Sequence, residues 1–255
     1  MNGHETFVLH LADNALVLGQ RNAEWCGHGP ILEEDLAMAN NALDLIGQAR
    51  MLYQHVAHLR QDGSTEDTLA YFRDADAFFN FTLLELPHAT ALAPSASVQR
   101  NYAVTIARNF LFSAYMVLVW ERLLHSEDQH LAAIADKSLK EVRYHWQHAA
   151  DWMLRFGGGT EESHTRAQLA LDFLFPYTQE FWTDWNARAS IPGEHESLSV
   201  DWLNTVNSVI SDAGLRSPSA VGHVTQGKMG IHSEHMSYLL AEMQSLARQH
   251  PGAVW

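Results

Sequence analysis

Apolar residues recur at intervals of three and four along most of this chain. In residues 32–59, Leu32, Leu36, Ala39, Leu43 and Ile46 follow this spacing, which is typical of one face of a helix. We find no stretch that alternates apolar and polar residues as a half-buried β-strand would. The pattern predicts an all-α protein.

The boundaries of the helices follow from the breakers between these periodic segments. Residues 27–30 combine glycine and proline, residues 157–159 are three glycines, and Pro251-Gly252 closes the last segment; such residues end helices. We expect loops over residues 89–97 and 191–199. The predicted helices cover about residues 5–24, 32–59, 98–124, 129–156, 166–188 with a kink at Pro176, 200–213 and 232–249.

A short connection predicts how the two central helices are arranged. The helices expected over 98–124 and 129–156 are joined by a short turn at Ser126, Glu127 and Asp128, and so short a turn implies antiparallel neighbours. Hydrophobic residues make up 47% of the chain, which includes eight Trp, enough for one deep core. We predict a single domain over residues 1–255, with four core helices and additional C-terminal helices packed around them.

Charge and cysteine content exclude several classes of function. Thirty acidic residues against sixteen Lys and Arg leave a formal charge of −14, which repels nucleic acid and anionic membranes. The most apolar stretch, residues 110–120, is too short to span a bilayer. The single Cys26 excludes an internal disulfide, and residues 1–20 lack the features of a signal peptide. We expect a cytoplasmic protein.

Sixteen histidines in an acidic helical protein raise the question of a metal site. Ferritin-like di-iron proteins use one carboxylate from each of two helices and Glu-x-x-His from each of the other two. Glu24, Asp44 and His145 match parts of this pattern, but Gly47 follows Asp44 by three residues and Val142 precedes His145 by three. Neither has a side chain that binds metal. We predict a ferritin-like bundle with a vestigial di-metal site at Glu24, Asp44, Val142 and His145, and no metal.

Two other pairs have the spacing of metal ligands. Glu85 and His88 are three residues apart, but Pro87 between them breaks the helix that would aim them. His232 and His235 share a helical face without a second contributor. We expect neither pair to bind metal.

Several longer strings resemble a known family, the C subunits (PaaC type) of the bacterial multicomponent phenylacetyl-CoA 1,2-epoxidases. They are spread over the whole chain, except for the divergent residues 160–218. The strings are Gly19 to Pro30, Asp44 to Arg50, Lys140 to His145, Gly227 to His235, Leu240 to Gln244 and Pro251 to Trp255.

The resemblance implies a non-catalytic subunit of a di-iron monooxygenase that epoxidises the aromatic ring of phenylacetyl-CoA in aerobic phenylacetate catabolism. The catalytic A subunit would hold the di-iron centre, and a separate reductase subunit would deliver electrons from NADPH. This chain would bury an apolar helix face against the A subunit and support it. Phe78, Phe79 and Asn80 are our candidates for one wall of a substrate channel at the subunit boundary, and Lys228 is our candidate for a contact with coenzyme A.

Two alternative hypotheses stay open. The chain could itself be a metal-binding ferritin-like oxidase or oxygenase, which predicts stoichiometric iron in the isolated protein. It could also be a helical binding protein without any link to the oxygenase, which predicts a monomer that ignores the A subunit. The missing ligands count against the first hypothesis, and the family strings count against the second.

Overall fold

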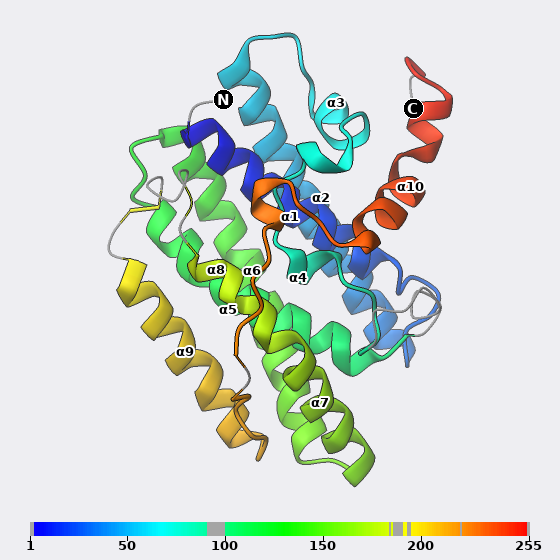
Figure 1. The fold of residues 1–255 in the computed structure, drawn as a ribbon, viewed down its shortest axis with the longest axis vertical. Coiled ribbons are helices and arrows are strands. Elements are labelled where there is room, and N and C mark those ends of the chain that lie inside the picture. The colour runs from blue at the N-terminus through cyan, green and yellow to red at the C-terminus, as the bar shows by residue number, and fades with distance from the viewer. Residues whose placement is uncertain are drawn as a thin grey trace. The chain divides into compact units, whose positions relative to one another are not determined.

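The computed structural model of this chain describes residues 3–90, 100–183, 185, 191–192, 195–219 and 221–253. Over these ranges the ordered elements are helices, and the backbone pairs as a β-bridge only between Gln226 and Ile231. The all-α prediction is confirmed (Figure 1). The α-helices are α1 (Gly3–Ala23), α2 (Leu32–Arg60), α3 (Glu66–Tyr71), α4 (Thr82–Glu85), α5 (Tyr102–Leu123), α6 (Gln129–Gly157), α7 (Glu161–Leu174), α8 (Gln179–Trp182), α9 (His195–Asp212) and α10 (Glu234–Gln249), with 3-10 turns η1 (Ala75–Ala77), η3 (Phe175–Thr178) and η5 (Gly227–Met229).

The chain divides into two compact units. The first comprises Met1–Leu86, Trp185–Ser190 and Thr225–Trp255, and the second comprises Pro87–Asp184 and Ile191–Val224. The first unit therefore contains α1 to α4 and α10, and the second contains α5 to α9. The single domain expected from the sequence stays a prediction.

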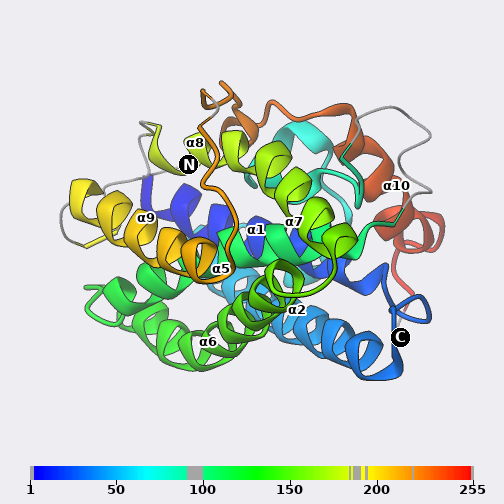
Figure 2. The same cartoon turned by 90° about the horizontal axis from the view of Figure 1, so that it is seen from below.

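The first unit is built on the antiparallel pair α1 and α2, which lie side by side in Figures 1 and 2. At one end of the pair, Arg60 donates a hydrogen bond to the carboxylate of Glu5 at 2.7 Å. At the other end the helices approach so closely that a Cβ on Gly19 would lie 3.3 Å from the Cβ of Leu45. α10 packs against α3, η1 and α4.

α2 carries apolar residues on two faces. The helix expected over 32–59 is confirmed, but most of the large residues whose spacing predicted it lie on the exposed face. Leu32 is 72% exposed, Leu36 56% and Leu43 66%. The core of the unit is filled instead by a second set of apolar residues on the same helix: Met38, Ala42, Leu45, Ala49, Leu52 and Val56.

The second unit is built on α5 and α6, which are also antiparallel neighbours, as the short turn predicted. The rings of Phe110 on α5 and Trp146 on α6 stack with centroids 5.0 Å apart. Near the start of α5, Tyr102 meets Trp152 edge to face at 5.5 Å. α7 and α9 pack against this pair, where the buried indole of Trp202 donates a hydrogen bond to the carbonyl of Leu111 at 3.0 Å.

One described helix, α5, is long and apolar enough to cross a bilayer by length and composition alone, and 89% of its most apolar window is buried inside the structure. A core helix that is apolar on all sides has the same properties. The apolar run at residues 110–120 is the middle of this helix.

Helix ends differ from the predictions where side-chain caps decide them. α5 begins at Tyr102 and not at residue 98, because the Asn101 side chain accepts a hydrogen bond from the backbone N–H of Ala103. Most of the loop predicted over 89–97 lies outside the described residues. α7 begins at Glu161 because Thr160 caps it in the same way.

The segment predicted as one kinked helix over 166–188 is interrupted. α7 ends at Leu174, a 3-10 turn that contains Pro176 follows, and α8 ends at Trp182. The fixed φ of proline suits the start of such a turn, and its missing N–H breaks the helical hydrogen-bond ladder. The loop predicted over 191–199 is wrong in its second half, because α9 begins at His195.

We predict that Gly157→Ala destabilises the protein by about 1–3 kcal/mol, because overpacking against backbone atoms forces the chain to shift. A Cβ at Gly157 would lie 1.9 Å from the carbonyl oxygen of Ala213, whereas a Cβ at Gly158 would lie 3.4 Å from its nearest neighbour. Urea unfolding of both alanine variants measures the difference. Equal midpoints for the two variants would show that α6 and α9 do not meet as closely as described.

Candidate functional site in the first unit

The four predicted di-metal positions divide between the two units. Glu24, just after α1, and Asp44 on α2 belong to the first unit, whereas Val142 and His145 on α6 belong to the second. The carboxylate of Glu24 accepts a hydrogen bond from Arg21 at 2.7 Å. Asp44 is partly exposed, and Val142 and His145 are buried. The vestigial site stays a prediction.

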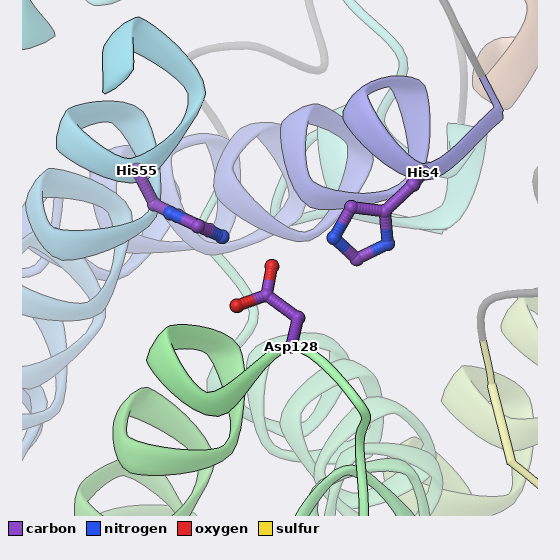
Figure 3. Close-up of side chains that lie close together, drawn as sticks. All are labelled: His4, His55 and Asp128. Carbon is purple, nitrogen blue, oxygen red and sulfur yellow. The ribbon is translucent and has the colours of Figure 1, made fainter. Parts of the chain in front are cut away.

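Two histidines that no motif singled out lie close together in the first unit. His4 on α1 and His55 on α2 point toward each other in Figure 3, with one ring nitrogen of each within 4.8 Å of the other. Two ligands do not complete a metal site. Taken by itself, each unit brings no three His, Cys, Asp or Glu ligand atoms together among its described residues.

Asp128, also drawn in Figure 3, has a structural task within the second unit. Its carboxylate accepts the backbone N–H groups of His130 at 3.0 Å and Leu131 at 3.1 Å. It is the N-cap of α6, where a carboxylate satisfies open donors and suits the helix dipole.

The most developed polar arrangement in the described chain is a buried cluster in the first unit, built on α1. His10, Asp13 and Asn14 are at most 2% exposed and share one face of the helix at positions i, i+3 and i+4. His10 Nδ1 donates to the carbonyl of Phe79 at 2.5 Å. The backbone N–H of Phe79 donates to Asp13 Oδ2 at 2.8 Å, and that of Phe81 donates to Asn14 Oδ1 at 2.8 Å. Three side chains of α1 therefore hold an extended segment that has no sheet partner.

The charge of Asp13 is balanced by Arg73, which lies between α3 and η1. Arg73 donates to both carboxylate oxygens of Asp13, and its Nη1 lies 3.1 Å from Oδ2. Tyr53 on α2 donates its hydroxyl to Asp13 Oδ1 at 2.6 Å. Burial raises the pKa of Tyr53 well above its usual value, and the neighbouring Asp13 charge raises it further. The Arg73 guanidinium also covers the ring of Phe78 at 4.0 Å.

A second buried carboxylate, Glu85, is balanced by His232. Glu85 Oε2 accepts from His232 Nδ1 at 2.8 Å and from the side-chain amide of Asn80 at 3.2 Å. Glu85 Oε1 accepts the backbone N–H of Ser233 at 2.6 Å. The other ring nitrogen of His232 donates to the carbonyl of Phe78 at 2.9 Å. Because both ring nitrogens face acceptors, His232 fits this place as an imidazolium.

The two histidines of the cluster differ in charge: the ring of His10 is neutral and that of His232 is protonated. Burial lowers the pKa of His10 to about 3, and Asn14 donates an amide hydrogen to its Nε2 at 3.0 Å, so the ring is neutral at pH 7. Burial also acts to lower the pKa of His232, but the hydrogen bond and the charge of Glu85 outweigh it and raise the pKa above its usual value. His10 is therefore a hydrogen-bonding group, whereas His232 is a counter-ion.

The residues predicted for a substrate channel and a coenzyme A contact lie together at this cluster. Phe78, Asn80 and Lys228 are buried, and a Cβ on Gly227 would lie 2.5 Å from the carbonyl oxygen of Asn80. The ammonium of Lys228 lies 5.9 Å from the centre of the Trp185 ring. The channel wall and the coenzyme A contact both stay predictions.

No sequence motif pointed to the residues of α1 that organise the cluster. The signal was present, because His10, Asp13 and Asn14 are the polar residues within an otherwise apolar run over 7–18. Three polar residues on one face of a buried helix require partners inside the protein. Their partners lie 40 to 69 positions away along the chain, a separation that periodicity does not reveal.

We predict that Arg73→Met lowers the free energy of unfolding by about 3–5 kcal/mol, because it leaves the buried Asp13 carboxylate without its counter-charge. The double variant with Asp13→Asn recovers part of this loss, since the uncompensated charge is gone. Arg143→Met is the control: its exposed pair with Glu121, at 2.8 Å, contributes at most about 1 kcal/mol. Urea unfolding measures all three variants. If the Arg73→Met variant is as stable as the control, Arg73 is not the counter-charge on which the buried Asp13 depends.

We predict that the cost of His232→Gln depends on pH. Because the folded-state pKa of His232 is raised, its contribution is fully present below the unfolded value of about 6.5 and disappears as pH rises through the folded value. The variant therefore loses more stability at pH 6 than at pH 9. The exposed His58→Gln is the control. An equal loss at both pH values would mean that His232 is held as a neutral ring.

Comparison with known proteins places the chain in a family. It matches the phenylacetic acid catabolic protein family over residues 2–255. It is also similar to the C subunit of the 1,2-phenylacetyl-CoA epoxidase of Escherichia coli (strain K12), with 40% identity over 262 residues that cover 100% of both chains. The resemblance noted in the sequence is confirmed. This protein belongs to the phenylacetic acid catabolic protein family.

Proposed function

We propose that this chain is a non-catalytic subunit of a multicomponent phenylacetyl-CoA 1,2-epoxidase in aerobic phenylacetate catabolism. The observation that carries the proposal is the full-length similarity to a protein named as the C subunit of that enzyme. A subunit of a multicomponent enzyme works beside other subunits, and we propose that this one pairs with the catalytic A subunit and supports it.

The chemistry of the buried cluster supports a structural role. Both oxygens of Asp13 and both oxygens of Glu85 accept hydrogen bonds from donors within the chain. Both ring nitrogens of His10 and of His232 are engaged as well. A catalytic acid, base or metal ligand needs an open position toward substrate or metal. These four side chains are committed to holding the protein's own backbone and helices together.

Oxygen activation and epoxidation would then take place in the partner subunit. We propose that the A subunit holds the di-iron centre that supplies oxygen activation, and that electrons from NADPH reach it through a separate reductase subunit. Phenylacetyl-CoA would bind at the boundary between the A subunit and this chain, and the complex would work in the cytoplasm. The missing ligand at Val142, three residues before the buried His145, supports iron in the partner rather than in this chain.

We predict that this chain, purified alone from iron-replete cells, contains no stoichiometric iron and forms no epoxide from phenylacetyl-CoA. Mixed with the A subunit and the reductase, it restores NADPH-dependent epoxidation, whereas the A subunit with the reductase alone is less active or less stable. Metal analysis and product detection measure these outcomes. About two irons per isolated chain would revive the alternative, a ferritin-like oxygenase or oxidase in its own right.

A further inference from the structure

The exposed face of α2 is a continuous apolar surface. The outer α2 stripe consists of Leu32, Leu36, Ala39, Leu43 and Ile46, whose side chains range from partly to largely exposed. It runs for about 21 Å at the helical rise of about 1.5 Å per residue. Single exposed apolar residues are ordinary, but aligned Leu and Ile side chains along one helix mark an interaction surface.

Gly47 lies on the same face, four residues after Leu43. A Cβ at this position would meet nothing within 4 Å, so the fold of this chain does not require a glycine there. A glycine inside a helix costs about 0.5–1 kcal/mol relative to alanine. A residue that is unfavourable for the helix and unnecessary for its own packing fits a place where another backbone approaches closely.

A groove next to Ile46, on the side of α2 that faces α3, extends the outer α2 stripe. It has a volume of about 280 Å³ between α2 and α3 in the first unit, and Ile46, Ala49 and Arg50 line it from α2. Arg50 crosses the groove to Glu66 on α3 at 3.3 Å. A side chain from a helix that lies on the stripe can enter this groove, which widens the contact beyond the leucines.

The charges around the stripe favour a different chain over a second copy. The acidic Glu33 and Asp44 each follow a leucine of the stripe, and Arg50 already pairs with Glu66. A two-fold contact along the stripe would bring these acids near acids of the other copy, between two chains of formal charge −14 each, and like charges at an interface oppose association. A partner helix that is apolar along its centre and carries Lys or Arg at its edges complements this surface.

We propose that the outer α2 stripe is the docking surface for an apolar, Lys- or Arg-bordered helix of the catalytic A subunit, which crosses α2 at Gly47. The inference rests on the proposed function, because it takes its partner from the same enzyme. It assigns the contact to the exposed face of α2.

The test compares the affinity of purified variants for the purified A subunit by calorimetry. Leu36→Glu combined with Leu43→Glu weakens binding at least about 30-fold, because two charges then face an apolar helix. Leu169→Glu on α7 is the matched control: Leu169 is 54% exposed, as Leu36 is 56%, and this variant binds like the wild type. Unchanged affinity of the double variant, while the wild type binds, overturns the docking surface and leaves the proposed function standing.

Gly47→Ala separates binding from folding. The new methyl group meets nothing inside the chain, so the variant melts slightly higher than the wild type, yet it binds the A subunit about tenfold more weakly. If the Gly47→Ala variant binds the A subunit as tightly as the wild type does, the partner helix does not cross α2 at Gly47. Sedimentation of the chain alone provides the last outcome: a dimer that the two Leu→Glu changes dissociate makes the stripe a contact between copies and overturns the proposal. A wild type that binds no A subunit overturns both the proposal and the proposed function.

Discussion

A buried carboxylate on the first helix sets the organisation of the first unit. Asp13 is fully buried, and an ionised carboxylate in the interior is tolerated only with a counter-charge and donors around it. It obtains them from three separate places: the hydroxyl of Tyr53 on α2, the guanidinium of Arg73 and the backbone N–H of Phe79. Satisfying one charge therefore brings together α1, α2 and the chain that follows α3.

The same requirement extends to the C-terminal part of the chain. The segment held by α1 continues into α4, where the buried Glu85 needs a second counter-ion and finds it in His232. The backbone N–H of Ser233, which caps α10, binds the other oxygen of Glu85. Two internal ion pairs thus connect the beginning, the middle and the end of the first unit. Asp13, Glu85, His10 and His232 find their hydrogen-bond partners within the chain, as groups with a structural task do, and this agrees with the proposed supporting subunit.

α2 carries one apolar face inside the first unit and another on the surface. Its buried face, with Leu45 and Leu52, packs within the first unit, whereas its outer face, with Leu36 and Leu43, stays exposed. Both faces have helical periodicity, so the overall amphipathic character of the helix is weak. In a chain proposed to act within a complex, the second apolar face has a use that the isolated fold does not explain.

The sequence alone determined the helical class, the long helices α1, α2, α5, α6 and α10, the antiparallel α5–α6 turn and the family, because periodicity, breakers and motif strings are local properties. It did not reveal α3, which starts with a capping box that uses Thr65 and Thr68 instead of an acid. Only the tertiary structure decided which apolar face of α2 is buried, and which distant groups balance Asp13 and Glu85. Burial and ion pairing depend on contacts between segments that are far apart in the chain, and local pattern carries no information about them.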